Sequence, residues 1–268
     1  MRRLKQTILS GLMVIACFTI FSVVNQAAAQ IKNTIKMKQK VLFVITSHDK
    51  KGDTGQSTGY YLSEVSHPWE VLYKAGYEID FVSPKGGKAP VDGFNLNDPI
   101  NREFWDNQNY RSKVENTMKP SEVDAGQYIA ILYAGGHGTM WNFADNIELA
   151  SIAAKIYEDG GIVSAVCHGP AGLINIKLSN GTFLVDGKKI NAFTNEEEVA
   201  AGFDKVVPFM LESKLIERGA KFEKSGLWQA HTTIDQRVIT GQNPASAKGV
   251  GEAVLTELKK FKHLVPAN

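Results

Sequence analysis

Near its middle the chain reads Gly160-Gly161-Ile162-Val163-Ser164-Ala165-Val166-Cys167-His168-Gly169-Pro170-Ala171-Gly172. The apolar, β-branched run at 162–166 predicts a short buried strand. Cys167 and His168 follow this run directly, and the Gly-Pro-Ala sequence after them is typical of a helix start. A thiol at such a turn would lie near a helix N-terminus, where the helix dipole favours the thiolate. The alternative interpretation is a buried structural cysteine beside a packed histidine.

The first 29 residues have the features of a secretory signal peptide. A basic start is followed by an apolar run over 8–24 and by three alanines at 27–29, which form a small-residue cleavage site. We therefore expect an exported protein, periplasmic or extracellular, that meets the membrane only through this leader. An uncleaved anchor and lipidation at Cys17, which follows a lipobox-like sequence, are the alternatives.

The cysteine count and the charge also bear on function. The chain has two cysteines, and Cys17 lies in the leader, so the mature chain would hold only Cys167. A single thiol forms no internal disulfide, and chemistry is the simplest reason to keep one in an exported protein. The leader carries three positive charges and no acid, so the formal charge of +2 becomes −1 without it. Nothing in this balance indicates a nucleic-acid or anionic-lipid partner.

Strands and helices alternate along the rest of the chain. A flexible lead-in at 30–39 precedes one α/β domain over 40–262. The expected strands are 41–46, 77–82, 128–133, 162–166, 230–234 and 238–240. One expected helix starts at Ser66, with Pro68 in its first turn. Further helices are expected at 145–157, 207–218 and 244–261. We also expect a hairpin at 182–190 and an irregular stretch at 85–127 that covers a site. This order predicts a doubly wound, mostly parallel sheet with helices on both faces.

Polar residues follow three of the expected strands, and their carboxyl ends meet at one edge of such a sheet. Glu64 comes after the first strand, Gly135-Gly136-His137-Gly138 after the third and Cys167-His168 after the fourth. A nucleophilic cysteine needs a partner for its proton and donors for a developing oxyanion. His168 could be that partner, and the backbone at Gly135 and Gly136 could supply the donors; an ordinary tight turn is the alternative.

Glu64 lies among apolar neighbours, where a carboxyl could have a raised pKa and share a proton with the thiolate. A solvated acid at a helix start is the alternative interpretation. His48, His231 and His263 show no metal-ligand spacing, so we expect no metal site.

Together these motifs resemble the ThiJ/PfpI superfamily, which is related to the class I glutamine amidotransferases. Ala165-Val166-Cys167-His168-Gly169-Pro170 and Ala134-Gly135-Gly136-His137-Gly138 carry the resemblance. The sequences at 63–68, 76–84 and 240–244 are similar to the heat-shock chaperone-like, glyoxalase III branch. A late His-x-Glu pair typical of amidotransferases is missing, since Thr232 and Thr233 follow His231.

The resemblance implies a flavodoxin-like sandwich with Cys167 on a strained nucleophile elbow. It implies that His168 is the histidine adjacent to the nucleophile and that Glu64 is the acid that contacts the thiolate. It also implies that Glu198 is the acid that supports His168, although Glu196 and Glu197 are close enough to take this role instead. Gly135, Gly136 and His137 would bind the substrate or its oxyanion.

The resemblance further implies a homodimeric, cofactor-independent lyase that converts methylglyoxal or glyoxal to a hydroxy acid, with deglycase or chaperone activity beside it. Two other hypotheses remain: a cysteine peptidase or amidase that uses the same Cys-His pair, and a non-enzymatic exported stress chaperone.

Overall fold

The computed structural model describes residues 40–263, with side chains as far as Lys260, and these residues belong to one compact unit that begins at Lys40. The expected leader at 1–29 and lead-in at 30–39 lie outside the described residues. The strands are β1 Lys40–Val44, β2 Tyr60–Tyr61, β3 Glu78–Val82, β4 Val91–Asp92, β5 Tyr128–Tyr133, β6 Ile162–Val166, β7 Lys189–Ile190, β8 Lys221–Phe222, β9 Thr232–Asp235 and β10 Val238–Gly241. The helices are α2 Leu62–Lys74, α3 Pro99–Asp106, α4 Gln108–Glu115, α5 Thr139–Asn142, α6 Ile147–Glu158, α7 Asn195–Ala201, α8 Leu211–Glu217 and α9 Ala247–His263.

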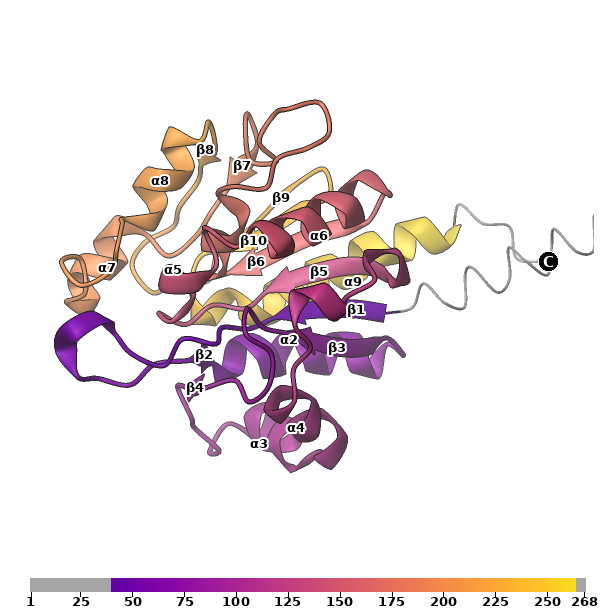
Figure 1. Ribbon diagram of the computed structural model, residues 1–268, viewed down its shortest axis with the longest axis horizontal. Helices are drawn as coiled ribbons and strands as arrows, with labels where there is room; N and C mark the ends of the chain where they lie inside the picture. The colour runs from indigo at the N-terminus through magenta and orange to yellow at the C-terminus, as the bar shows by residue number, and fades with distance from the viewer. Residues whose placement is uncertain (1–39, 264–268) are drawn as a thin grey trace, which may run out of the picture. The chain divides into compact units, whose positions relative to one another are not determined.

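A six-stranded sheet forms the centre of this unit, in the order β3-β1-β5-β6-β10-β9 (Figure 1). Its strands are parallel except β9, which runs antiparallel to β10. The chain passes from β1 outward to β3 and then returns to the other side of β1 at β5, so the sheet is doubly wound. The fold prediction is therefore confirmed, and the carboxyl ends of β1, β5 and β6 lie side by side, where such sheets place their sites.

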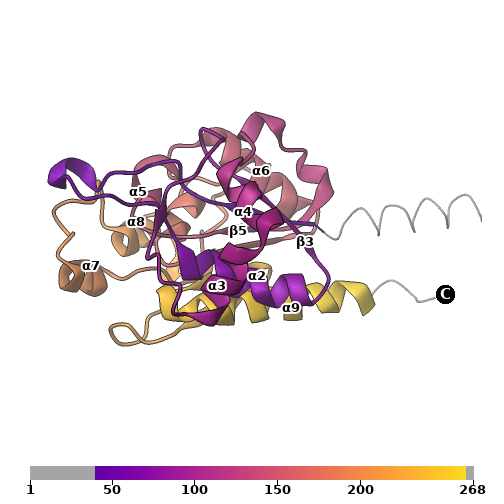
Figure 2. The ribbon, with the colours of Figure 1, turned by 90° about the horizontal axis from the view of Figure 1, so that it is seen from below.

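Helices cover both faces of the sheet, because the strand residues alternate between two apolar clusters. Val41 and Phe43 of β1 pack into one cluster with Trp69 of α2 and Val254 of α9. Leu42 and Val44 of β1 pack into the other cluster, with Leu149 and Ala153 of α6. Figure 2 shows α2 beside α9, and these two helices contact each other. This packing fixes the strand ends from both sides.

Several expectations about the elements are wrong. Helix α2 begins at Leu62 and not at Ser66, so Pro68 lies inside the helix. The helix is one turn longer than expected because Leu62 and Val65 are buried on the same face as Trp69 and Leu72.

The stretch at 85–127 is not irregular, because it contains α3 and α4. The side chain of Asp98 accepts hydrogen bonds at the start of α3, and the side chain of Asn107 does so at the start of α4. The expected hairpin at 182–190 is absent as well. Instead, β7 pairs in parallel with β8, which lies about 30 residues further along the chain.

No helix among the described residues is both long enough and apolar enough to cross a membrane.

Candidate active site

Cys167 occupies a strained turn at the carboxyl end of β6. Its φ angle is 60°, a left-handed value that non-glycine residues adopt at a cost of about 1–3 kcal/mol. Two backbone hydrogen bonds hold the residue in place: its N–H donates to the carbonyl of Gly241 at 2.8 Å, and its carbonyl accepts from the N–H of Phe193 at 2.8 Å. The chain then forms a 3₁₀ turn over Gly169–Leu173, not the α-helix that the sequence predicts.

The thiol of Cys167 is buried, with 3 % of the residue exposed. Sγ lies 3.3 Å from Nδ1 of His168, and the backbone N–H groups of Gly136 and His168 are directed at it. Burial raises the pKa of the thiol well above its usual value, and the neighbouring Glu64 adds to this effect. The expectation that a helix dipole stabilises the thiolate is therefore wrong: a full α-helix does not follow, and burial dominates. At rest Cys167 is a neutral thiol.

Glu64 reaches the thiol from the first turn of α2 and is completely buried. Its Oε2 accepts a hydrogen bond from the N–H of Gly135 at 2.8 Å, and its carboxyl group interacts with Cys167. Burial raises the pKa of Glu64 to about 8, in the direction the sequence predicts. Oε1 has no hydrogen-bond partner among the described residues. Glu64 is thus a protonated acid at neutral pH, and its carboxyl group shares a hydrogen bond with the thiol of Cys167.

The turn after β5 must be made of glycine because it lies against the elbow. A Cβ atom on Gly135 would stand 2.5 Å from Oε2 of Glu64, 2.6 Å from the carbonyl of Val166 and 2.7 Å from the nitrogen of His168. Gly136 has a φ angle of 99°, which favours glycine. The N–H of Gly135 is taken by Glu64, so it is not the oxyanion donor we expected. The N–H groups of Gly136 and His168 are the ones available at the sulfur.

His168 is oriented by Glu198, which lies on α7. Nε2 of His168 is 2.8 Å from Oε2 of Glu198, and both residues are buried. Burial alone would raise the pKa of Glu198, but hydrogen bonds from His137 and His168 together lower it to about 2. An ionised carboxylate only accepts hydrogen bonds, so His168 donates its Nε2 proton and leaves Nδ1 as the acceptor that faces the thiol.

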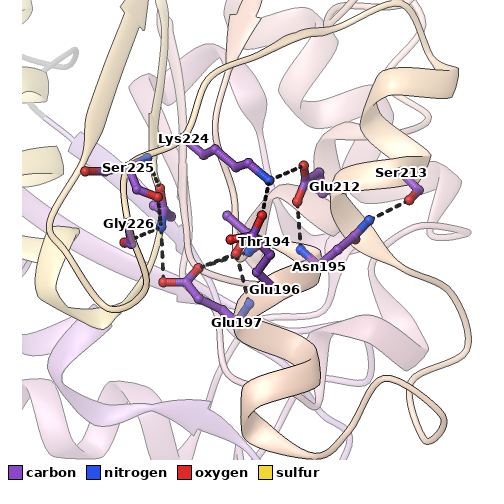
Figure 3. A network of polar contacts seen from close by, with 10 residues as sticks. Thr194, Asn195, Glu196, Glu197, Glu212, Ser213, Lys224, Ser225 and Gly226 are labelled. Carbon is purple, nitrogen blue, oxygen red and sulfur yellow. Dashed lines mark hydrogen bonds and ion pairs between the residues drawn. The ribbon is translucent and has the colours of Figure 1, made fainter.

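The other two candidate acids have different partners (Figure 3). Glu196 pairs with Lys224, which also contacts Glu212. Glu197 is buried at the start of α7, where its carboxylate accepts from the N–H and hydroxyl of Thr194 in a capping box. Its Oε1 also accepts from the N–H of Trp228 and from the side chains of Gln242 and Asn243. Only Glu198 therefore reaches His168.

His137 lies behind the catalytic pair rather than at the sulfur. Its Nε2 is 3.0 Å from Oε1 of Glu198, and its ring centroid is 4.2 Å from that of His168. Burial, together with the unfavourable interaction that a second positive charge would have with the ring of His168, lowers the pKa of His137 to about 4. His137, His168 and Glu198 each have one potential metal-ligand atom, and these three atoms lie within 4.8 Å of one another. The sequence spacing gives no sign of this group, because the three residues come from three separate segments.

Aromatic rings border the site on both sides. The ring centroid of Phe193 lies 4.3 Å from that of His168. The ring centroid of Trp228 lies 5.7 Å from that of Phe193, and Trp228 is 49 % exposed. Phe203 lies 4.8 Å from the ring of His137. Sequence reasoning missed Trp228 and Phe203, because each belongs to a polar loop with no periodic pattern. The walls therefore come from segments that only the fold brings together.

Comparisons with known proteins identify the family to which the chain belongs. Residues 57–257 match the model of the DJ-1/PfpI family. The chain is 35 % identical to glyoxalase 3 of Candida albicans over 81 % of this chain and 97 % of that protein. It is also 35 % identical to the glutathione-independent glyoxalase HSP31 of Saccharomyces cerevisiae, over 82 % and 98 % of the two chains.

Solved structures give the same result. The crystal structure of the rapid encystment protein of 24 kDa from Francisella tularensis is similar with a TM-score of 0.79 and 39 % identity, over 82 % of this chain and 98 % of that one. Glyoxalase III from Candida albicans has a TM-score of 0.75 and 33 % identity, over 82 % and 97 %. This chain therefore belongs to the DJ-1/PfpI family.

Proposed function

We propose that the protein is a glutathione-independent glyoxalase that converts methylglyoxal or glyoxal to the corresponding 2-hydroxy acid, D-lactate in the case of methylglyoxal. The observation that carries this proposal is the thiol of Cys167 between a protonated acid, Glu64, and a base, Nδ1 of His168. The reaction moves one proton between adjacent carbons, and a cysteine with an acid on one side and a base on the other suits that task. The relatives named as glyoxalases support the same function.

The first half of the reaction forms a hemithioacetal. Cys167 gives its proton to Nδ1 of His168, and the sulfur attacks the aldehyde carbon of the substrate. Glu64 then protonates the new alkoxide through Oε1, which has no other hydrogen-bond partner among residues 40–260. Glu198 stabilises the imidazolium that has formed, through the contact at Nε2. The N–H groups of Gly136 and His168 stabilise negative charge at the attacking sulfur.

The second half moves the proton between the two carbons. Glu64, now a carboxylate, removes the former aldehyde hydrogen, and the imidazolium of His168 protonates the adjacent ketone oxygen to give an enediol. Glu64 returns its proton to that second carbon while His168 takes the proton of the first hydroxyl, which leaves a thioester on Cys167. Water then cleaves the thioester to release the hydroxy acid, and the thiol, neutral His168 and protonated Glu64 are restored.

A direct assay tests this function. Purified protein is given methylglyoxal without glutathione, and D-lactate is measured. We expect turnover by the wild type, none by Cys167→Ala, and for Glu64→Gln a hemithioacetal that forms without D-lactate release. D-lactate production by Cys167→Ala at the wild-type rate would disprove the mechanism. A peptide and aminopeptidase panel run alongside tests the hydrolase alternative.

We also propose that the protein is exported and forms homodimers. Export rests on the signal-peptide features of residues 1–29, and the dimer rests on the family resemblance. Cell fractionation with and without residues 1–29 tests the first proposal, and light scattering of the mature chain tests the second. A full-length protein retained in the cytoplasm, or a monomer at all concentrations, would contradict them.

A further inference from the structure

We propose that His137, His168 and Glu198 form a binding site for Zn²⁺, and that the bound ion switches off the active site. Two histidines and one carboxylate, with a fourth position open to water, are a ligand set that Zn²⁺ adopts in proteins. The binding part of this proposal depends only on geometry, whereas the inhibitory part depends on the proposed glyoxalase function.

The three side chains already lie close together around Glu198. Nε2 of His137 is 3.0 Å from Oε1 of Glu198, and Nε2 of His168 is 2.8 Å from Oε2. One ligand atom from each of the three residues lies within 4.8 Å of the other two. Metal bonds of about 2.0–2.1 Å place tetrahedral ligand atoms about 3.4 Å apart, so the side chains would have to shift by about an ångström to hold the ion. Three different segments supply them: the turn after β5, the elbow after β6 and helix α7.

The ligand group can be reached from the protein surface on one side. The side chain of His137 is 15 % exposed, while those of His168 and Glu198 are 1 % and 4 % exposed, so an ion would reach the group past His137.

Binding would remove the base from the reaction. Coordination through Nε2 requires the proton on that atom to leave or to move to Nδ1. In His168, Nδ1 is the atom that faces the thiol at 3.3 Å. With Nε2 on the metal and a proton on Nδ1, the ring can no longer accept the proton of Cys167. Substrate turnover and metal binding therefore exclude each other.

The test measures Zn²⁺ binding in a background that cannot turn over. Cys167→Ser protein, which lacks the competing thiol ligand, is dialysed against Zn²⁺, and bound metal is counted per chain. We expect about one Zn²⁺ per chain. The count should fall to near zero in the double variants Cys167→Ser/His137→Phe and Cys167→Ser/Glu198→Gln. The matched control is Cys167→Ser/His67→Phe, because His67 is a part-buried histidine paired with an acid, Asp98, outside the group.

Two results would overturn the proposal: no bound Zn²⁺ in Cys167→Ser, or bound Zn²⁺ that both double variants keep while their melting temperatures match that of the control. Two disruptive variants are used so that loss of fold in one leaves the other to decide. With wild-type protein, Zn²⁺ should inhibit D-lactate formation, and a chelator should restore it. Because the count of bound metal needs no activity, failure of the glyoxalase proposal would leave the metal site still tested.

Discussion

Replacing Glu64 by Gln should make the protein more stable, by an amount that grows with pH. Glu64 is fully buried, and burial raises its pKa from 4.5 to about 8. Between these pH values the unfolded chain releases this proton while the folded chain keeps it. Stability therefore falls as pH rises from about 4.5 to about 8, and no further loss from this group occurs above that. The difference between the two pKa values corresponds to about 5 kcal/mol at most.

Glutamine reproduces the protonated form of Glu64 and does not titrate. Its side-chain oxygen can still accept from the N–H of Gly135, as Oε2 of Glu64 does at 2.8 Å. The free energy of unfolding, measured in urea at pH 5, 6.5 and 8, should differ little between wild type and Glu64→Gln at pH 5. At pH 8 the variant should be more stable by several kcal/mol.

The matched control is Glu70→Gln on the same helix. Glu70 forms a surface ion pair with Lys74, and its replacement should change stability by less than about 1 kcal/mol at each pH. If the curves for wild type and Glu64→Gln run parallel from pH 5 to pH 8, Glu64 is not protonated in the folded protein, and the assignment of Glu64 as the acid is wrong.

Three further predictions concern the residues around the elbow. Glu198→Gln should lower kcat/KM for methylglyoxal on the order of 10³-fold without loss of fold, since the imidazolium of His168 loses its ionised partner; a change below tenfold would contradict this. Glu197→Gln should lower the free energy of unfolding by about 3 kcal/mol and speed proteolysis near Trp228, because a buried carboxylate with several donors is lost. Gly135→Ala should destabilise by about 2–3 kcal/mol in thermal melts, whereas Gly226→Ala, which meets only the flexible side chain of Gln229, should change stability little.

The strands of the sheet and the elbow could be predicted from the sequence because both have local signals. A strand buried on both faces reads as a continuous apolar run, and β5 and β6 are predicted to the residue. Cys167 follows such a run directly. The two helices at 99–115 could also be predicted from the sequence, because Asp98-Pro99 and Asn107 are helix start signals. The prolines and the few apolar runs of this stretch favour an irregular structure instead, and that prediction is wrong.

The contacts of the acids could not be predicted, because they depend on tertiary packing. Glu196, Glu197 and Glu198 are adjacent on one helix, and 100° of rotation per residue sends each to a different partner. The pairing of His137 with Glu198 joins segments 61 residues apart. The hydrogen bond from the N–H of Gly135 to Glu64 depends on where α2 starts. Because α2 starts at Leu62, Glu64 lies in its first turn, and this position directs the carboxyl group at Gly135.

The raised pKa of Cys167 changes the explanation of its reactivity. A helix dipole would have produced a standing thiolate, which reacts with any oxidant that reaches it. The buried thiol is instead neutral until Nδ1 of His168, 3.3 Å away, takes its proton. The imidazolium is stabilised by Glu198, so the thiolate forms only as part of an ion pair inside the site. We propose that the protein is exported, and the mature chain would then have no second cysteine to convert a sulfenic acid on Cys167 to a reducible disulfide. A neutral resting thiol therefore limits oxidation of Cys167. It still allows the thiolate to form and attack an aldehyde that is bound in the site.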